Sequence, residues 1–175
     1  MHPLLEPGDP RVPPREHCVV GELLAARAAR RPDGVFVVFE DESRWTNRDV
    51  HDRARSTAVG LRALGVGKGD PVLSWLPNGG HALATWFGTN LLGGVHVPVN
   101  TAYRGTLLEH VIRNSGARVM VAHAGLLDRL AGLDLGSLRH IVAVPGPTTA
   151  VPAGVEVHGA DVFANPPDGF VPSDD

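Results

Sequence analysis

Residues 61–99 read LRALGVGKGDPVLSWLPNGGHALATWFGTNLLGGVHVPV. Two apolar and β-branched runs in this stretch, 71–76 and 94–99, are typical of buried strands. The run 81–92 between them contains apolar residues on nearly all sides of a helix and is therefore expected to be a buried helix. A strand, a helix and a second strand joined by short turns form the pattern of a right-handed βαβ unit. This part of the chain thus predicts neighbouring parallel strands.

The same alternation of strand and helix continues on both sides of this stretch. Further strands are expected at 118–122, 140–144 and 155–157, further helices at 21–31, 46–64, 106–115 and 126–130, and a hairpin at 35–45. Alternating strands and helices with short connections are typical of a parallel sheet covered by helices. We therefore expect an α/β fold: a doubly wound, mainly parallel sheet with flanking helices plus a small N-terminal hairpin.

Two expected helices begin with the capping pattern [ST]-x-x-[DE]. Thr46 is followed by Asp49, and Thr106 is followed by Glu109. In a capping box the Ser or Thr side chain accepts a hydrogen bond from the backbone N–H of the acidic residue three positions later. The acidic side chain in turn accepts one from the backbone N–H of the Ser or Thr. The sequence predicts a capping box at both places.

Length and residue usage suggest one main unit with two extensions. The chain has 175 residues, which is the size of a single domain at roughly 100–200 residues per domain. Prolines crowd both ends, where no periodic pattern is present. We expect an extended arm over 1–20, an α/β unit over 21–144, and a proline- and glycine-rich loop and tail over 145–175.

Composition excludes several classes of function. The formal net charge of −3 provides no basic field for non-specific nucleic-acid binding. No window approaches the roughly 18–20 apolar residues that cross a bilayer, and prolines and charges interrupt the start of the chain, unlike a secretory signal. Cys18 is the only cysteine, so no intrachain disulfide can form. A cytoplasmic location is expected.

Two glycine-rich turns are candidates for phosphate binding. A phosphate-binding loop follows a strand and opens a helix, but 65–70 (GVGKGD) follows a helix and opens a strand, which favours a plain turn. The turn 77–80 (PNGG) has the correct order and lies at the carboxyl edge of the predicted sheet. Either its N–H groups bind an anion or Asn78 simply caps the helix, and capping is the favoured interpretation.

Histidine spacing gives no metal site. The nine histidines include no pair with the i, i+4 spacing of a helical metal clamp, and there is no cysteine pair. His96 and His140 fall in predicted strands and are expected to be core or rim groups. The sequence therefore predicts neither a metal ligand nor a catalytic residue.

The ordered blocks of residues 61–122 carry a resemblance to a known family. The run continues as VPVNTAYRGTLLEHVI at 97–112 and SGARVMVA at 115–122. These blocks resemble the N-terminal region of AMP-forming acyl-CoA synthetases, in the adenylate-forming superfamily, over about residues 21–144. The block at 97–112 is most similar to carnitine/crotonobetaine-type and related short-acid CoA ligases. The resemblance implies the first subdomain of the adenylate-forming fold.

The resemblance also implies a reaction and its cofactors. A carboxylic acid, ATP and CoA would give acyl-CoA, AMP and diphosphate, with Mg²⁺ on the triphosphate. Motifs of the family are missing here: the hydroxyl-rich phosphate loop with its lysine, the Tyr-Gly-x-Thr-Glu block, the ribose-binding aspartate and the C-terminal lysine. Fifteen of the sixteen basic residues are arginines, and Lys68 lies in a turn before a predicted strand. We therefore expect an N-terminal fragment that supplies scaffold and part of the cleft wall, is inactive alone and binds none of these cofactors tightly.

Two arginines are candidates for binding CoA. In some members of this family CoA phosphates lie near this subdomain, on arginines in or after the block that reads NTAYRG at 100–105 here. Arg104 matches such a position, and Arg129 is a second, weaker match. The favoured alternative is that both are solvated surface residues at helix ends.

A second hypothesis is a free-standing binding or regulatory module built from the same half-fold, without chemistry. It predicts a clean monomer or dimer that binds a small ligand. A fragment would instead expose apolar surface and an unpaired sheet edge, which promotes self-association. Size-exclusion chromatography and binding of a hydrophobic dye distinguish the two. A nicotinamide-dependent enzyme is excluded because the glycines are misplaced for its dinucleotide loop.

Overall fold

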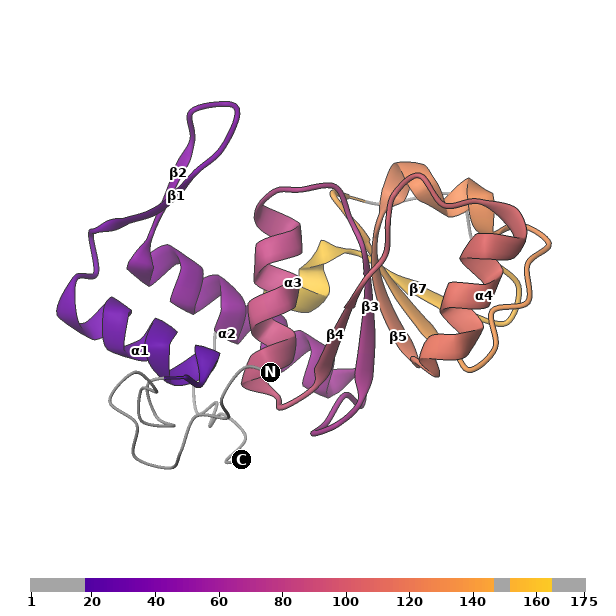
Figure 1. Cartoon of the computed structure of the whole chain (residues 1–175), viewed down its shortest axis with the longest axis horizontal. Helices are drawn as coiled ribbons and strands as arrows, with labels where there is room; N and C mark the ends of the chain where they lie inside the picture. Colours follow the sequence, from indigo (N-terminus) through magenta and orange to yellow (C-terminus); the bar gives the residue numbers. More distant parts are fainter. Residues whose placement is uncertain (1–17, 147–151, 165–175) are drawn as a thin grey trace, which may run out of the picture.

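The computed structural model describes residues 18–146 and 152–164 (Figure 1). A five-stranded sheet lies at its centre, and every neighbouring pair of its strands is parallel. The strands follow the spatial order β4-β3-β5-β6-β7. Their bounds are β3 Pro71–Trp75, β4 Val95–Pro98, β5 Val119–His123, β6 His140–Val144 and β7 Glu156–His158.

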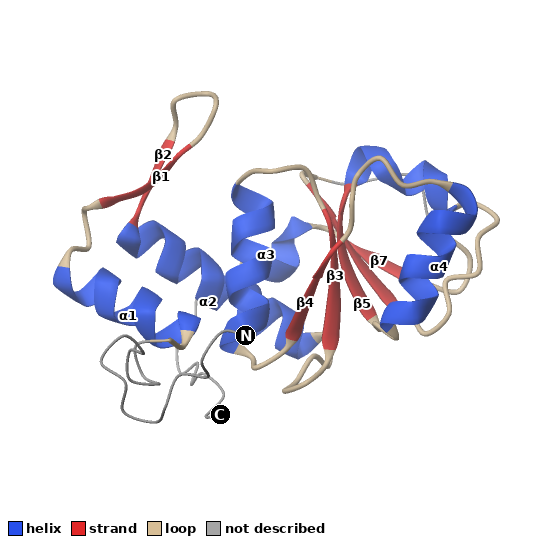
Figure 2. Cartoon of the chain, viewed as in Figure 1, coloured by secondary structure: helices blue, strands red, loops and turns tan. Residues whose placement is uncertain are grey.

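Helices flank this sheet, and a separate hairpin projects from the N-terminal part (Figure 2). Strands β1 (Val35–Val38) and β2 (Arg44–Thr46) pair antiparallel in the hairpin. The helices are α1 Val20–Arg30, α2 Asn47–Ala63, α3 Gly80–Leu91 and α4 Gly105–Ser115, with 3₁₀ helices η2 Ala124–Leu130 and η3 Ala160–Phe163. The sequence prediction of the fold class is therefore confirmed, with element bounds shifted by one or two residues.

Alternation along the strands separates two apolar cores. Val72, Val121 and Val142 point to one face, where they pack with apolar residues of α1, α2 and α3. Leu73, Met120 and Ile141 point to the other face, where residues of α4 and η2 cover them. Side chains of a strand alternate between the faces of a sheet, so a sheet with helices on both faces needs strands that are apolar throughout.

Helices α2 and α3 pack closely because Gly88 has no side chain. A Cβ built on Gly88 would lie 2.7 Å from the Cβ of Thr57 and 3.0 Å from the carbonyl oxygen of Ala54. One side of α3 is nevertheless open, since Trp86 is 44% exposed. The expectation that this helix is buried on nearly all sides is wrong on that side, where Trp86 lines a surface crevice.

The two predicted capping boxes have different outcomes. At α2 the box forms: the N–H of Asp49 donates to Oγ1 of Thr46, and the N–H of Thr46 donates to Oδ2 of Asp49. At α4 it does not form, because the helix starts one residue before Thr106 and has Arg104 as its N-cap, without a side-chain hydrogen bond. Glu109 instead accepts a hydrogen bond from the N–H of Asp134.

The sheet continues past residue 144, with β7 where a strand was expected at 155–157. β7 pairs with β6, and η3 packs against α2. The arm over 1–20 lies almost wholly outside the described residues, so the proposed division at residues 20 and 144 stays a prediction. No helix in the described ranges is long and apolar enough to cross a membrane.

Candidate functional site

A crevice of about 1320 Å³ opens at the carboxyl ends of β3 and β4. Its walls are the hairpin β1–β2, the start of α3 and the loop that follows β4. Ligands of open parallel sheets bind at the carboxyl ends of the strands. Position and size therefore make this crevice the candidate functional site.

The turn 77–80 forms one wall of the crevice. The N-cap of α3 is Gly79, with φ 153° and no side-chain cap, so the expectation that Asn78 caps this helix is wrong. A Cβ on Gly80 would lie 2.4 Å from the ring of Trp45, because the indole packs directly on the first turn of α3. Gly80 thus lets the hairpin approach the helix start, whereas Gly79 permits the backbone angle of the turn.

Two histidines line the crevice, the exposed His81 and the partly buried His96. Burial lowers the pKa of His96, whose ring stacks on Trp86 at 6.1 Å between centroids. Burial, with the nearby charges of Arg53 and His123, lowers the pKa of His81. The Nε2 atom of His96 is buried and has no hydrogen-bond partner among the described residues.

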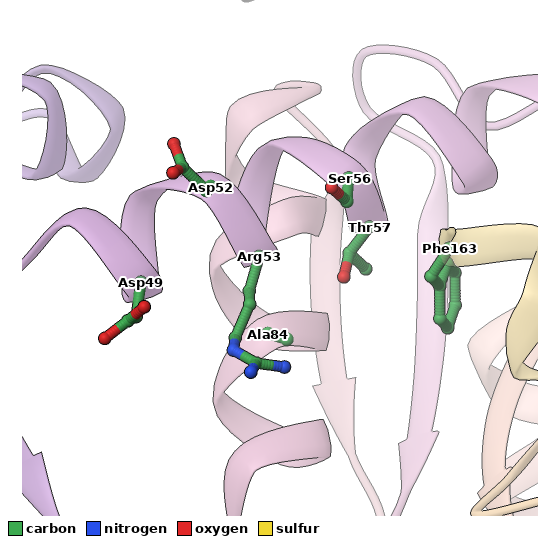
Figure 3. Close-up of a pocket in the computed structure, with 7 residues that line it drawn as sticks. All are labelled: Asp49, Asp52, Arg53, Ser56, Thr57, Ala84 and Phe163. Atoms are coloured by element: carbon green, nitrogen blue, oxygen red, sulfur yellow. The ribbon is translucent and has the colours of Figure 1, made fainter. Parts of the chain in front are cut away.

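Arg53 of α2 was not singled out from the sequence, where it resembles any residue on the wet side of an amphipathic helix. Its guanidinium lies 4.4 Å from the ring centroid of Trp45, a cation–π geometry. It also reaches toward Ala84 of α3 in a smaller pocket of about 330 Å³ beside Thr57 and Phe163 (Figure 3). Arg53 therefore links the two cavities, which only the folded arrangement could show.

The structure gives Arg129 a local role. Its Nη1 donates a hydrogen bond of 2.6 Å to the carbonyl oxygen of Thr101, in the loop between β4 and α4. The same loop is fixed by Trp75, whose Nε1 donates to the carbonyl oxygen of Asn100. Arg104, at the end of this loop, is exposed. Arg129 thus holds the loop, whereas the guanidinium of Arg104 faces solvent.

The single lysine lies on the opposite edge of the sheet. Lys68 is exposed in the turn that enters β3, at its amino end, whereas the crevice lies at the carboxyl end. The crevice therefore contains arginine and histidine but no lysine.

Comparison with known proteins identifies the family. The model of the AMP-binding enzyme family matches residues 24–165, most of the chain. The chain belongs to the AMP-binding enzyme family. The resemblance found in the sequence is thereby confirmed, and only the closer likeness to carnitine/crotonobetaine-type ligases stays a prediction.

Curated relatives of this AMP-binding domain include CoA ligases. A 3-[(3aS,4S,7aS)-7a-methyl-1,5-dioxo-octahydro-1H-inden-4-yl]propanoyl:CoA ligase of Mycobacterium tuberculosis is 38% identical over 120 residues, which are 65% of this chain and 23% of that protein. The medium/long-chain-fatty-acid–CoA ligase FadD6 of the same organism is 32% identical over 130 residues, 74% of this chain and 21% of the relative. Human long-chain fatty acid transport protein 6 is 32% identical over 90% of this chain and 25% of its own length. The chain thus spans about a quarter or less of these relatives.

Solved structures show the same fold. The anthranilate CoA ligase AuaEII in complex with anthranoyl-AMP superposes with a TM-score of 0.74 at 23% identity, over 88% of this chain and 29% of that one. The N-terminal domain of FACL13 from Mycobacterium tuberculosis superposes with a TM-score of 0.64 at 24% identity, over 88% of this chain and 37% of that domain. The architecture is therefore that of adenylate-forming enzymes.

Proposed function

We propose that this chain is the N-terminal part of an ATP-dependent, AMP-forming acyl-CoA ligase, which converts a carboxylic acid, ATP and CoA into acyl-CoA, AMP and diphosphate. The observation that carries the proposal is the match of the AMP-binding enzyme family to residues 24–165, joined by relatives named as CoA ligases. The likeness to a solved N-terminal domain supports the assignment to that part of the fold.

Within such an enzyme, residues 18–164 would supply scaffold and one wall of the cleft rather than the adenylation machinery. A triphosphate with Mg²⁺ needs cations that neutralise developing charge and oxygen ligands for the metal. Lys68 lies at the far edge of the sheet. The crevice carboxylates Glu40 and Asp41 lie on the hairpin tip, where Asp41 already accepts hydrogen bonds from the N–H and hydroxyl of Ser43. The described residues do not fit Mg²⁺-ATP, so we assign them no step of its chemistry.

Exposed apolar side chains favour a part of a larger protein over a free-standing module. Val95 of the edge strand β4 is 51% exposed, and Trp86 beside it on α3 is 44% exposed. Val35 and Val38 of the hairpin are more than half exposed. Apolar side chains gathered at a sheet edge usually mark a surface that another segment covers.

The test is ATP–pyrophosphate exchange with the purified chain and a panel of aromatic, octahydroindenyl-propanoic and fatty acids. We expect no acid-dependent exchange, with a full-length CoA ligase as positive control. Measurable exchange by these 175 residues would contradict the scaffold role. The DNA downstream of the codon for Asp175 provides the complementary check: a hydroxyl-rich glycine loop ending in lysine, in this or another frame, would support the proposal, and its absence from every frame would favour a half-protein.

The role of Arg104 needs a complete enzyme that carries this domain. If its exposed guanidinium binds a CoA phosphate, Arg104→Ala raises the KM for CoA while kcat stays nearly constant, and Arg104→Lys restores most of the affinity. Arg129→Ala is the comparison variant. It removes the hydrogen bond to the carbonyl oxygen of Thr101 and should therefore lower the melting temperature, which Arg104→Ala should not. An unchanged KM for CoA in Arg104→Ala would remove Arg104 from the site.

A further inference from the structure

Two histidines and a glutamate meet on the outer strands of the sheet, away from the crevice. His140 begins β6, while Glu156 begins and His158 ends the edge strand β7. In the register of the two strands, His140 is opposite Glu156 and Val142 is opposite His158. The three residues therefore lie on one face of the sheet, the face on which Val142 packs toward α2.

The potential ligand atoms of this triad lie within 4.8 Å of one another. Nδ1 of His140 is 3.2 Å from Nε2 of His158. The carboxylate of Glu156 lies between them, with Oε2 at 3.5 Å from His140 Nδ1 and Oε1 at 3.8 Å from His158 Nε2. Three side chains from two strands thus gather in one cluster, in which a different carboxylate oxygen approaches each imidazole.

Two of these separations, 3.2 Å and 3.5 Å, are close to an edge of a metal coordination polyhedron, and the third, 3.8 Å, is longer. Zinc bound tetrahedrally at about 2.0–2.1 Å from nitrogen holds neighbouring ligand atoms about 3.3 Å apart. Without a metal, the shortest separation is a hydrogen bond between the imidazoles and the other two are histidine–glutamate ion pairs, and each of these contacts requires a ring nitrogen that carries a proton. A cation in the centre satisfies both lone pairs and the carboxylate together.

We propose that His140, Glu156 and His158 form a zinc-binding site, with the fourth coordination position open to water. Two imidazole nitrogens and one carboxylate suit Zn²⁺ better than Mg²⁺ or Ca²⁺, which prefer oxygen ligands. The histidine side chains are only 24% and 18% exposed, so their strands fix them, whereas the carboxylate is 67% exposed and leaves an entry path for the ion. The site is independent of the proposed ligase activity.

The bound ion would hold the edge strand β7 to its neighbour β6. β7 has only three residues and, among the described residues, pairs with β6 alone. A metal that bridges residues 140 and 158 closes the intervening segment and holds β7 in register. The first expected consequence is a zinc-dependent rise in melting temperature.

Zinc binding by the full chain tests this site. The protein is produced without a histidine tag, stripped with a chelator and titrated in competition with a chromogenic zinc indicator. We expect one zinc ion per chain, a higher melting temperature with zinc, and a visible absorption band of tetrahedral type when Co²⁺ replaces zinc.

Variants decide whether the triad is responsible. His158→Ala and Glu156→Gln are expected to weaken zinc binding by at least about tenfold, since losing even an outer-shell partner of a metal ligand costs that much. His110→Ala, which removes an exposed histidine of α4, serves as the matched control and keeps the wild-type affinity. Circular dichroism establishes that each variant is folded.

If His158→Ala does not fold, the zinc affinity of Glu156→Gln, a variant at an exposed residue, tests the site by itself. No zinc binding by the wild type, or wild-type affinity in Glu156→Gln or in folded His158→Ala, would overturn the proposal.

Discussion

The helices on the two faces of the sheet are held in different ways. α2 has seven buried residues, begins with a complete capping box and packs tightly on α3. α4 buries only Leu108 and Ile112, has no side-chain cap and exposes half of Leu107. Its outer face is fixed by surface contacts, such as the pair of Arg113 with Asp134. Exposed ion pairs contribute little, whereas close packing contributes much.

This contrast separates a closely packed flank, formed by α2 and α3, from a less closely packed one, formed by α4. The crevice lies between the hairpin, α3 and the loop before α4, so it is bounded by both flanks. On the α2–α3 side Arg53 packs on Trp45, while Arg104 at the start of α4 is exposed although Arg129 and Trp75 hold the preceding loop. Substitutions in the two flanks should therefore have unequal effects on stability.

The largest difference is expected for a leucine on each helix. Leu61 of α2 is fully buried, whereas Leu107 of α4 is 51% exposed. Leu61→Ala should lower the free energy of unfolding by about 3 kcal/mol, because it leaves a cavity, and Leu107→Ala by less than about 0.5 kcal/mol. Urea denaturation followed by circular dichroism measures both. Equal losses would show that the two flanks are held alike.

A smaller effect is expected where α2 meets α3. Gly88→Ala places a methyl group 2.7 Å from the Cβ of Thr57, a contact that cannot form without moving a helix. We expect a loss of about 1–3 kcal/mol by overpacking. Gly67→Ala, in an open turn with its nearest neighbour at 3.7 Å, is the control and should unfold at nearly the wild-type urea concentration. Tolerance of Gly88→Ala would mean that α2 and α3 pack less closely than described.

The capping motifs provide the next comparison. Thr46→Ala removes a hydrogen bond to the N–H of Asp49 and should cost about 1 kcal/mol. Thr106→Ala removes no cap and should cost less than about 0.5 kcal/mol. Both are measured as shifts of the urea midpoint at constant m-value. A cost for Thr106 as large as that for Thr46 would indicate a capping box at α4 after all.

The smallest effect is expected for the pH dependence of stability through His96, whose ring stacks on Trp86 of α3. Because burial lowers the pKa of His96 below its ordinary value of 6.5, the unfolded chain binds a proton more readily than the folded one. The free energy of unfolding should therefore decrease as pH falls below about 6.5, and His96→Gln should lose that part of the dependence. Unfolding curves at about pH 7.5 and pH 5.5 measure the difference. Parallel pH profiles of wild type and variant would contradict it.

Much of the fold could be predicted because local patterns and tertiary structure agree. The apolar runs of β3, β5 and β6 lie where the alternation placed them, and so does the cap at Thr46. The second cap failed because the backbone starts α4 at Gly105, with φ 53°, and the loop to β6 recruits Glu109. A short motif cannot report such a competition between distant segments.

The candidate sites were less predictable because they join residues remote in sequence. Arg53 and Trp45 meet the start of α3 only after folding. His140 and His158 are eighteen positions apart, and strand pairing alone brings them together. Sequence spacing predicted no metal site, since it detects ligands on one helix but not on neighbouring strands. That prediction now stands against the zinc proposal, and the titration decides between them.

The position of Lys68, far from the crevice, allows the chain to be labelled at one site. With one ε-amine in the whole chain, acylating reagents can mark a single side chain, and a lysine-specific protease can cut only between α2 and β3. A fluorophore or surface linker attached there would sit behind the sheet and leave the crevice facing outward. Because lysine occurs only once, the domain can thus be attached in one orientation for binding experiments at the crevice.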